Sequence, residues 1–166
     1  MKKDSFWEDL RSGQFASMVR EASRGQILSN SRDVHNIIKP LTAGHEDVET
    51  MYGIFLNSKN RLMGIEKLFS GSINGASVYP REIVKRMLDL KANALILAHN
   101  HPSGNLSPSP QDKHLTRTLH IICSFMHIRL LDHFIIGDGE TTYSFADNGL
   151  MSTIRDDCQA LVEAIL

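Results

Sequence analysis

The sequence predicts an α/β fold in which helices flank a central mixed β-sheet, preceded by a short helical N-terminal extension. From residue 48 onward, segments with a strand-like pattern alternate with segments whose apolar residues recur at helical spacing, which is typical of a sheet covered by helices. The run of residues 93–99, NALILAH, is almost entirely apolar, as expected of a strand that is covered on both faces.

The first 45 residues differ in pattern from the rest of the chain. Residues 4–23 have the apolar spacing of a helix. Residues 31–41 suggest a second, short helix, which Ser31 would cap and which Pro40 would end or kink. Residues 44–47, GHED, have the composition of a linker into the main domain.

The main domain is predicted to alternate strands and helices. The residues SKN separate two strand-like segments, which favours an antiparallel hairpin, and Pro80 is suited to the first position of a helix. In chain order, we expect strand 48–57, strand 61–71, helix 80–92, strand 93–99, helix 109–127, strand 129–137, strand 141–146 and a closing helix from about residue 148.

Length and composition limit the classes of protein. With 166 residues, the chain is long enough for one domain, and we divide it into a helical N-terminal extension (1–45) and a main domain (46–166). The net charge of −1 gives no electrostatic support for nucleic acid as a partner. No signal peptide or membrane-spanning run is recognisable, so we expect a cytoplasmic protein with no membrane partner. The oligomeric state stays open.

Three side chains near the apolar strand could hold one metal ion. Residues two apart on a strand point the same way, so His99 and His101 would project side by side. Ser109 and Pro110 would begin the next helix, which places Asp112 in its first turn, facing back toward the histidines. Two histidines and one aspartate leave a position open for water, as in catalytic zinc sites. The alternative is that Ser109 and Asp112 only cap the helix.

The pattern His99-x-His101, seven residues, Ser109, two residues, Asp112 resembles the HxHx7SxxD motif of the JAMM (MPN+) zinc metalloprotease family. Between about residues 31 and 151 the chain is similar to the C-terminal domain of its RadC branch, in segments such as ANALILAHNHPSGNLSPSPQD and RLLDHFIIGDGETTYSF. The resemblance implies a JAMM/MPN fold, related to that of cytidine deaminases. It also implies that His99, His101 and Asp112 bind Zn²⁺.

The same resemblance assigns roles to further residues. Ser109 would hydrogen-bond the oxygen atoms of the reaction, and an upstream glutamate would act as general base. Glu49 stands at the offset seen in the family, and Glu66 is kept as the second candidate. His133 matches a recurrent residue of the RadC branch and is interpreted as structural or as a support for the site.

Together, these features predict a zinc-dependent metallopeptidase or isopeptidase that hydrolyses an amide bond with a zinc-activated water. Its substrate would be an unknown protein or peptide. The alternative is a DNA-repair-associated protein that binds nucleic acid or acts as a metal-dependent nuclease, which the charge does not support. A zinc deaminase is set aside, because the sequence contains neither HxE nor PCxxC.

Overall fold

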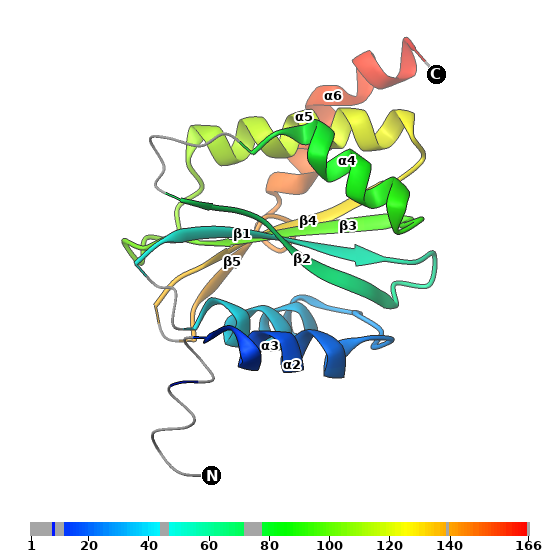
Figure 1. Cartoon of the computed structure of the whole chain (residues 1–166). Coiled ribbons are helices and arrows are strands. Elements are labelled where there is room, and N and C mark those ends of the chain that lie inside the picture. Colours follow the sequence, from blue (N-terminus) through cyan, green and yellow to red (C-terminus); the bar gives the residue numbers. More distant parts are fainter. Residues whose placement is uncertain (1–7, 9–11, 44–46, 72–77, 139, 166) are drawn as a thin grey trace.

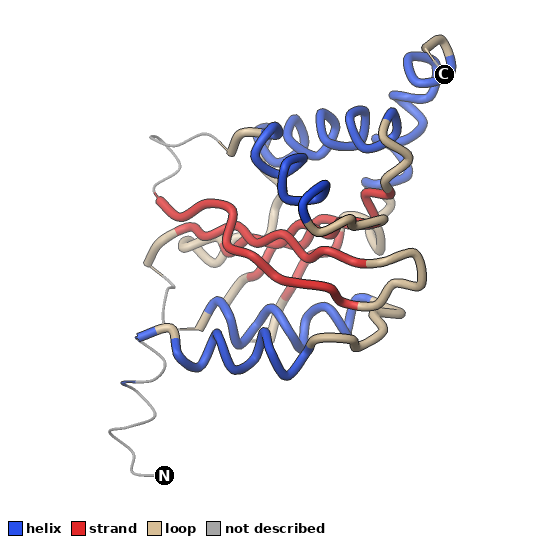
Figure 2. The backbone as a smooth tube through the Cα atoms, turned by 45° about the vertical axis from the view of Figure 1, so that its right-hand side comes forward, coloured by secondary structure: helices blue, strands red, loops and turns tan. Residues whose placement is uncertain are grey.

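The computed structural model describes residues 8, 12–43, 47–71, 78–138 and 140–165 (Figure 1). Its helices are α2 (Gln14–Ser23), α3 (Ser31–Thr42), α4 (Pro80–Asp89), α5 (Pro110–Phe125) and α6 (Leu150–Glu163). Its strands are β1 (Glu49–Leu56), β2 (Leu62–Gly71), β3 (Ala94–Asn100), β4 (Arg129–Ile136) and β5 (Thr142–Ser144). Helices α2 and α3 cover one face of the sheet, and α4, α5 and α6 cover the other (Figures 1 and 2).

The five strands form one mixed sheet in the order β2-β1-β3-β4-β5. Strands β1 and β2 make the expected antiparallel hairpin, and β1 also pairs antiparallel with β3. Strands β3 and β4 run parallel, because α5 carries the chain back across the sheet between them. The predicted α/β class with a central mixed sheet and flanking helices is confirmed.

Strand β3 divides the interior into two apolar cores. All seven of its residues are buried. Ile96 and Ala98 belong to the core beneath α2 and α3, whereas Leu95 and Leu97 belong to the core beneath α4, α5 and α6. Alternation along the strand therefore places His99 on the same face as Leu95 and Leu97, which is the face covered by α5.

The N-terminal helices differ locally from the prediction. Asn30, not Ser31, caps α3, because its side chain accepts a hydrogen bond from the Asp33 backbone N–H at 3.0 Å. Helix α3 also continues past Pro40 to Thr42. Proline removes one backbone donor near the end of this helix, but buried apolar side chains on either side, including Leu41, hold the last turn against the sheet.

Helix α3 is part of the main packing arrangement. Its buried side chains share a core with β1, β3 and β4, and the Tyr52 hydroxyl on β1 donates a hydrogen bond to the Leu41 carbonyl at 3.0 Å. Most of residues 4–13 and three residues of the expected linker, 44–46, lie outside the described residues. Within the part of the chain that is described, no helix has the length and apolar character needed to cross a membrane.

Candidate metal centre

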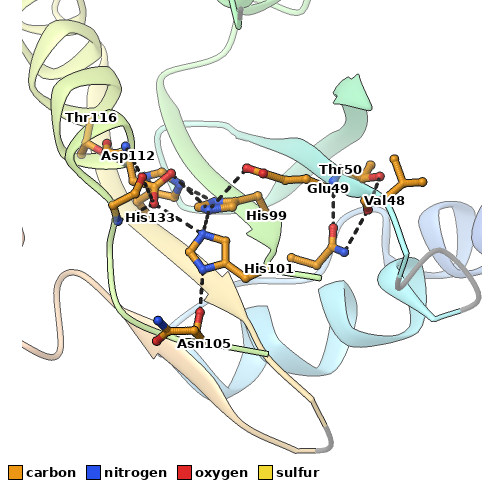
Figure 3. Close-up of polar contacts among 11 residues, drawn as sticks. Val48, Glu49, Thr50, His99, His101, Asn105, Asp112, Thr116 and His133 are labelled. Carbon is orange, nitrogen blue, oxygen red and sulfur yellow. Dashed lines mark hydrogen bonds and ion pairs between the residues drawn. The ribbon is translucent and has the colours of Figure 1, made fainter. Parts of the chain in front are cut away.

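Two side chains of the site come from the end of β3. His99 pairs with Met51 of β1 and with Ile135 of β4, and it is fully buried. The backbone N–H of His101 still donates to the Ile136 carbonyl at 3.1 Å, so the chain stays extended for one residue beyond the strand. Both imidazoles therefore point to the α5 face, side by side (Figure 3).

Glu49 reaches the same place from β1. It lies two residues before Met51, the partner of His99, and therefore shares that face of the sheet. Asn100 fixes the backbone on both sides of it, because its amide oxygen accepts from the Thr50 N–H at 2.8 Å and its amide nitrogen donates to the Val48 carbonyl at 3.0 Å. Asn100 thereby holds the start of β1.

Asp112 is supplied by the first turn of α5. Ser109 is the N-cap and Pro110 the first helical residue, as predicted. The Ser109 hydroxyl accepts from the Asp112 N–H at 3.1 Å and lies 2.7 Å from Asp112 Oδ2, to which it can donate. The Ser109 N–H donates to the same oxygen at 2.8 Å. The capping arrangement and the predicted site are thus built from the same residues: Asp112 Oδ1 faces His99, and Oδ2 also lies 3.5 Å from His101 Nε2.

The four side chains converge on one point. One potential ligand atom from each of Glu49, His99, His101 and Asp112 lies within 4.8 Å of all the others. The two Nε2 atoms of His99 and His101 are 2.8 Å apart. Asp112 Oδ1 lies 3.2 Å from His99 Nε2, and Glu49 Oε1 lies 4.0 Å from the same nitrogen.

A chain of hydrogen bonds behind His99 determines which of its nitrogens carries hydrogen. The Thr116 hydroxyl lies 2.6 Å from the Asp112 carbonyl, which can only accept, so the hydroxyl must donate there. The same hydroxyl oxygen is 2.7 Å from His133 Nδ1 and therefore accepts from it. His133 Nε2 is then a bare acceptor, which receives the Nδ1–H of His99 at 2.9 Å. In its neutral form, His99 therefore carries no hydrogen on Nε2.

His133 is well suited to this neutral role. It is completely buried, and its ring stacks on Phe145 with centroids 4.7 Å apart. Burial lowers the pKa of His133 well below its ordinary value, so the ring stays uncharged. A similar contact orients His101, because its Nδ1 lies 2.5 Å from the Asn105 carbonyl and must donate to it. His101 Nε2 is therefore also free to present a lone pair.

Two bare nitrogens cannot remain 2.8 Å apart unless a cation or a proton lies between them or beside them. Hydrogen bonding to Asp112 raises the pKa of His101, which is how a proton would occupy this place. Burial by itself would raise the pKa of Asp112, but the hydrogen bonds that a protonated His101 or His99 donates to it outweigh burial and hold that pKa well below its usual range. The cluster is thus a concentrated set of lone pairs that favours a positive charge.

Glu49 carries an atom with no partner. Its Oε2 is buried, and no donor among the described residues lies within hydrogen-bond distance of it. Burial raises the pKa of Glu49, although the nearby His99 and His101 act in the opposite direction. A carboxylate in this state is a good acceptor for a proton, because its pKa is moved toward neutrality and no hydrogen bond competes for the oxygen.

The second candidate glutamate lies elsewhere. Glu66 is paired with Gly53, farther along the hairpin than Met51, and its carboxylate makes a two-pronged ion pair with Arg86 of α4. It is not part of the cluster. The residues that sequence reasoning missed are Thr116 and Asn105. For Thr116 a signal existed, because it stands four residues after Asp112 and so lies one helical turn away.

A groove of about 860 Å³ opens beside the cluster, which is a volume typical of ligand sites. Glu49, His101, Ser109 and Asp112 form one part of its wall. A molecule in the groove would therefore meet the unpaired carboxylate, the histidine and the helix start together.

Comparison with known proteins agrees with this architecture. Residues 28–150, well over half of the chain, match the family model described as a RadC-like JAB domain. Over 131 residues (79% of this chain) the sequence is 44% identical to a UPF0758 protein of Halorhodospira halophila, covering 58% of that relative. Over 132 residues (80% of this chain) it is 52% identical to a UPF0758 protein of Vibrio atlanticus, again covering 58%.

A UPF0758 protein of Photobacterium profundum is 46% identical over 125 residues, which are 75% of this chain and 55% of the relative. The chain thus spans a little more than half the length of these relatives. Their names state no activity. The extent of the family match and the level of identity lead to one conclusion: the chain belongs to the family of proteins that carry a RadC-like JAB domain.

Proposed function

We propose that the protein is a zinc-dependent metallopeptidase or isopeptidase. The observation that carries this proposal is the meeting of two imidazole nitrogens with two carboxylates, one of which, Glu49, has an unpaired buried oxygen. The donor set fits Zn²⁺, which favours imidazole nitrogen together with carboxylate oxygen. His99, His101 and Asp112 would hold the ion, and Glu49, 4.0 Å from His99 Nε2, would stand next to the open position.

The chemistry follows from the positions of these groups. Zinc bound here supplies Lewis acidity, which polarises a carbonyl and makes water a stronger acid. Glu49 Oε2 takes the proton of the attacking water and later delivers it to the leaving nitrogen. The Ser109 hydroxyl donates to the developing oxyanion. For this it turns away from Asp112 Oδ2, which keeps the Ser109 N–H as a donor.

The groove also favours an amide over a nucleic acid as the substrate. Among the described residues that line it there is no lysine or arginine. Proteins that bind nucleic acids neutralise phosphates with such residues. We therefore keep the peptidase as the single proposed function.

The test is to replace Glu49 with glutamine. Glu49→Gln should keep the zinc content of the wild type, because the side chain hardly changes in size, and should lose about 10²- to 10⁴-fold in amide hydrolysis. Zinc is measured by atomic spectrometry, and hydrolysis by mass spectrometry of a digested peptide library. Glu66→Gln is the matched control and should leave the rate within a few fold. Zinc-dependent cleavage of DNA that survives Glu49→Gln would refute the proposal.

A further inference from the structure

One wall of the groove is apolar and begins directly beside the site. His99 of β3, Met51 of β1 and Phe69 of β2 are neighbours in one row across the sheet, so their side chains share a face. Met51 and Phe69 both line the groove. The row begins at His99, a proposed metal ligand, so a substrate group held at the cluster would lie directly beside these apolar side chains.

Two other elements complete this wall. Leu115 of α5 stands three residues after Asp112, which places it on the same side of the helix. Val78, just before α4, also lines the groove. Leu115, Val78 and Phe69 are only partly buried, which leaves apolar surface for a bound group to cover. We call Met51, Phe69, Val78 and Leu115 the apolar wall.

Another part of the lining is polar but uncharged. It belongs to the loop between β3 and α5, from which Ser103, Asn105 and Ser107 line the groove. Apart from histidines, the charged residues among the described lining are Glu49 and Asp112. A divalent ion held by His99, His101 and Asp112 would offset the charge of these two carboxylates, so little net charge would be left to attract a charged substrate side chain.

We propose that the apolar wall is a specificity pocket that receives a bulky apolar side chain from the residue next to the scissile amide. This inference rests on the proposed peptidase function and adds the class of substrate. A leucine or phenylalanine side chain would bury its surface against Phe69 and Leu115, whereas a lysine or glutamate would lose water without gaining a partner. Discrimination by an apolar pocket of this kind reaches about 10- to 200-fold for each methylene group.

The test uses amino-acid hydroxamates, in which the hydroxamate binds the metal ion and the side chain probes the groove. One series, N-acetyl amino-acid hydroxamates, places the side chain on the carbonyl side, and a succinyl series places it on the amine side. Their binding to the zinc-loaded protein is measured by calorimetry. In at least one series, the leucine compound should bind at least about tenfold more tightly than the lysine and glutamate compounds.

Substitutions test whether the apolar wall causes the preference for the leucine compound. Phe69→Ser should remove most of the preference and leave the zinc content unchanged. Val78→Thr keeps the size of the side chain and tests the same point with less risk to folding. Leu88→Ser is the matched control, because Leu88 is 57% exposed and does not line the groove; it should keep the preference.

Each outcome is decisive. Equal binding of the leucine, lysine and glutamate compounds in both series would overturn the specificity pocket while leaving the metallopeptidase in place. An unchanged preference in both Phe69→Ser and Val78→Thr would also overturn it. A wild-type protein that holds no zinc would instead overturn the proposed function, and with it this inference.

Discussion

Replacing Thr116 with valine tests whether the hydrogen bonds behind His99 set up the metal site. The substitution keeps the shape of the side chain and removes the hydroxyl that accepts from His133 Nδ1. The Asp112 carbonyl keeps its backbone partner within α5, so the one group left unpaired is the buried N–H of His133. An unsatisfied buried donor costs about 1–3 kcal/mol, which is the expected loss in the free energy of unfolding.

Thr116→Val should lower the zinc affinity more than the replacement of a residue that only packs would. Without Thr116, His133 can move its hydrogen to Nε2, and His99 must then carry hydrogen on the nitrogen that faces the metal position. Loss of a group that orients a ligating histidine lowers metal affinity by about 10- to 100-fold. We expect this reduction in a competition titration with a chromophoric chelator, together with a changed ¹⁵N chemical shift of His99 in the metal-free protein.

Thr153→Val is the matched control. Its hydroxyl also donates to a carbonyl four residues earlier, that of Gly149 at 3.2 Å, but it is exposed and bonds to no histidine of the described part of the chain. It should leave zinc affinity unchanged. If Thr116→Val bound zinc like the wild type and kept hydrogen on His99 Nδ1, the argument from the hydrogen-bond chain would be wrong.

Two further predictions concern acid stability and the position of Glu49. Burial lowers the pKa of His133, so below about pH 6.5 the unfolded chain binds a proton at this residue and the folded protein does not. Through this group, the free energy of unfolding of the metal-free protein should fall by up to about 1.4 kcal/mol for each pH unit of acidification. Urea titrations near pH 7 and pH 5 should show that His133→Gln loses less free energy of unfolding between these pH values than the wild type does. An equal loss in both proteins would contradict the assignment. Asn100→Ala should keep zinc but lower kcat/KM by about 10²-fold, because the start of β1 is released and Glu49 is misplaced; an unchanged rate would refute this role.

Local patterns were enough to predict the fold class and the meeting of the ligand candidates. The apolar run before His99 indicates a buried strand, and the spacing of two puts His101 on the same face. Pro110 fixes the helix start and hence the position of Asp112. Each of these signals lies within a few residues of its consequence, which is why the sequence alone could carry them.

Other features depend on pairings between distant segments. His133 lies 34 residues after His99, and their contact depends on the register of β3 against β4, which contains an irregularity between Leu95 and Ile96. The choice between Glu49 and Glu66 likewise depends on the register of β1 and on the ion pair that Arg86 makes with Glu66. No local pattern encodes these registers.

The two oxygens of Asp112 allow one side chain to take part in both the cap of α5 and the cluster. Oδ2 holds the beginning of α5 through Ser109 and lies 3.5 Å from His101 Nε2, and Oδ1 faces His99. The first turn of α5 also forms part of the groove. A substitution at Asp112 would therefore change the helix start, the shape of the groove and the donor set of the cluster at once, so its effect on activity would combine all three losses.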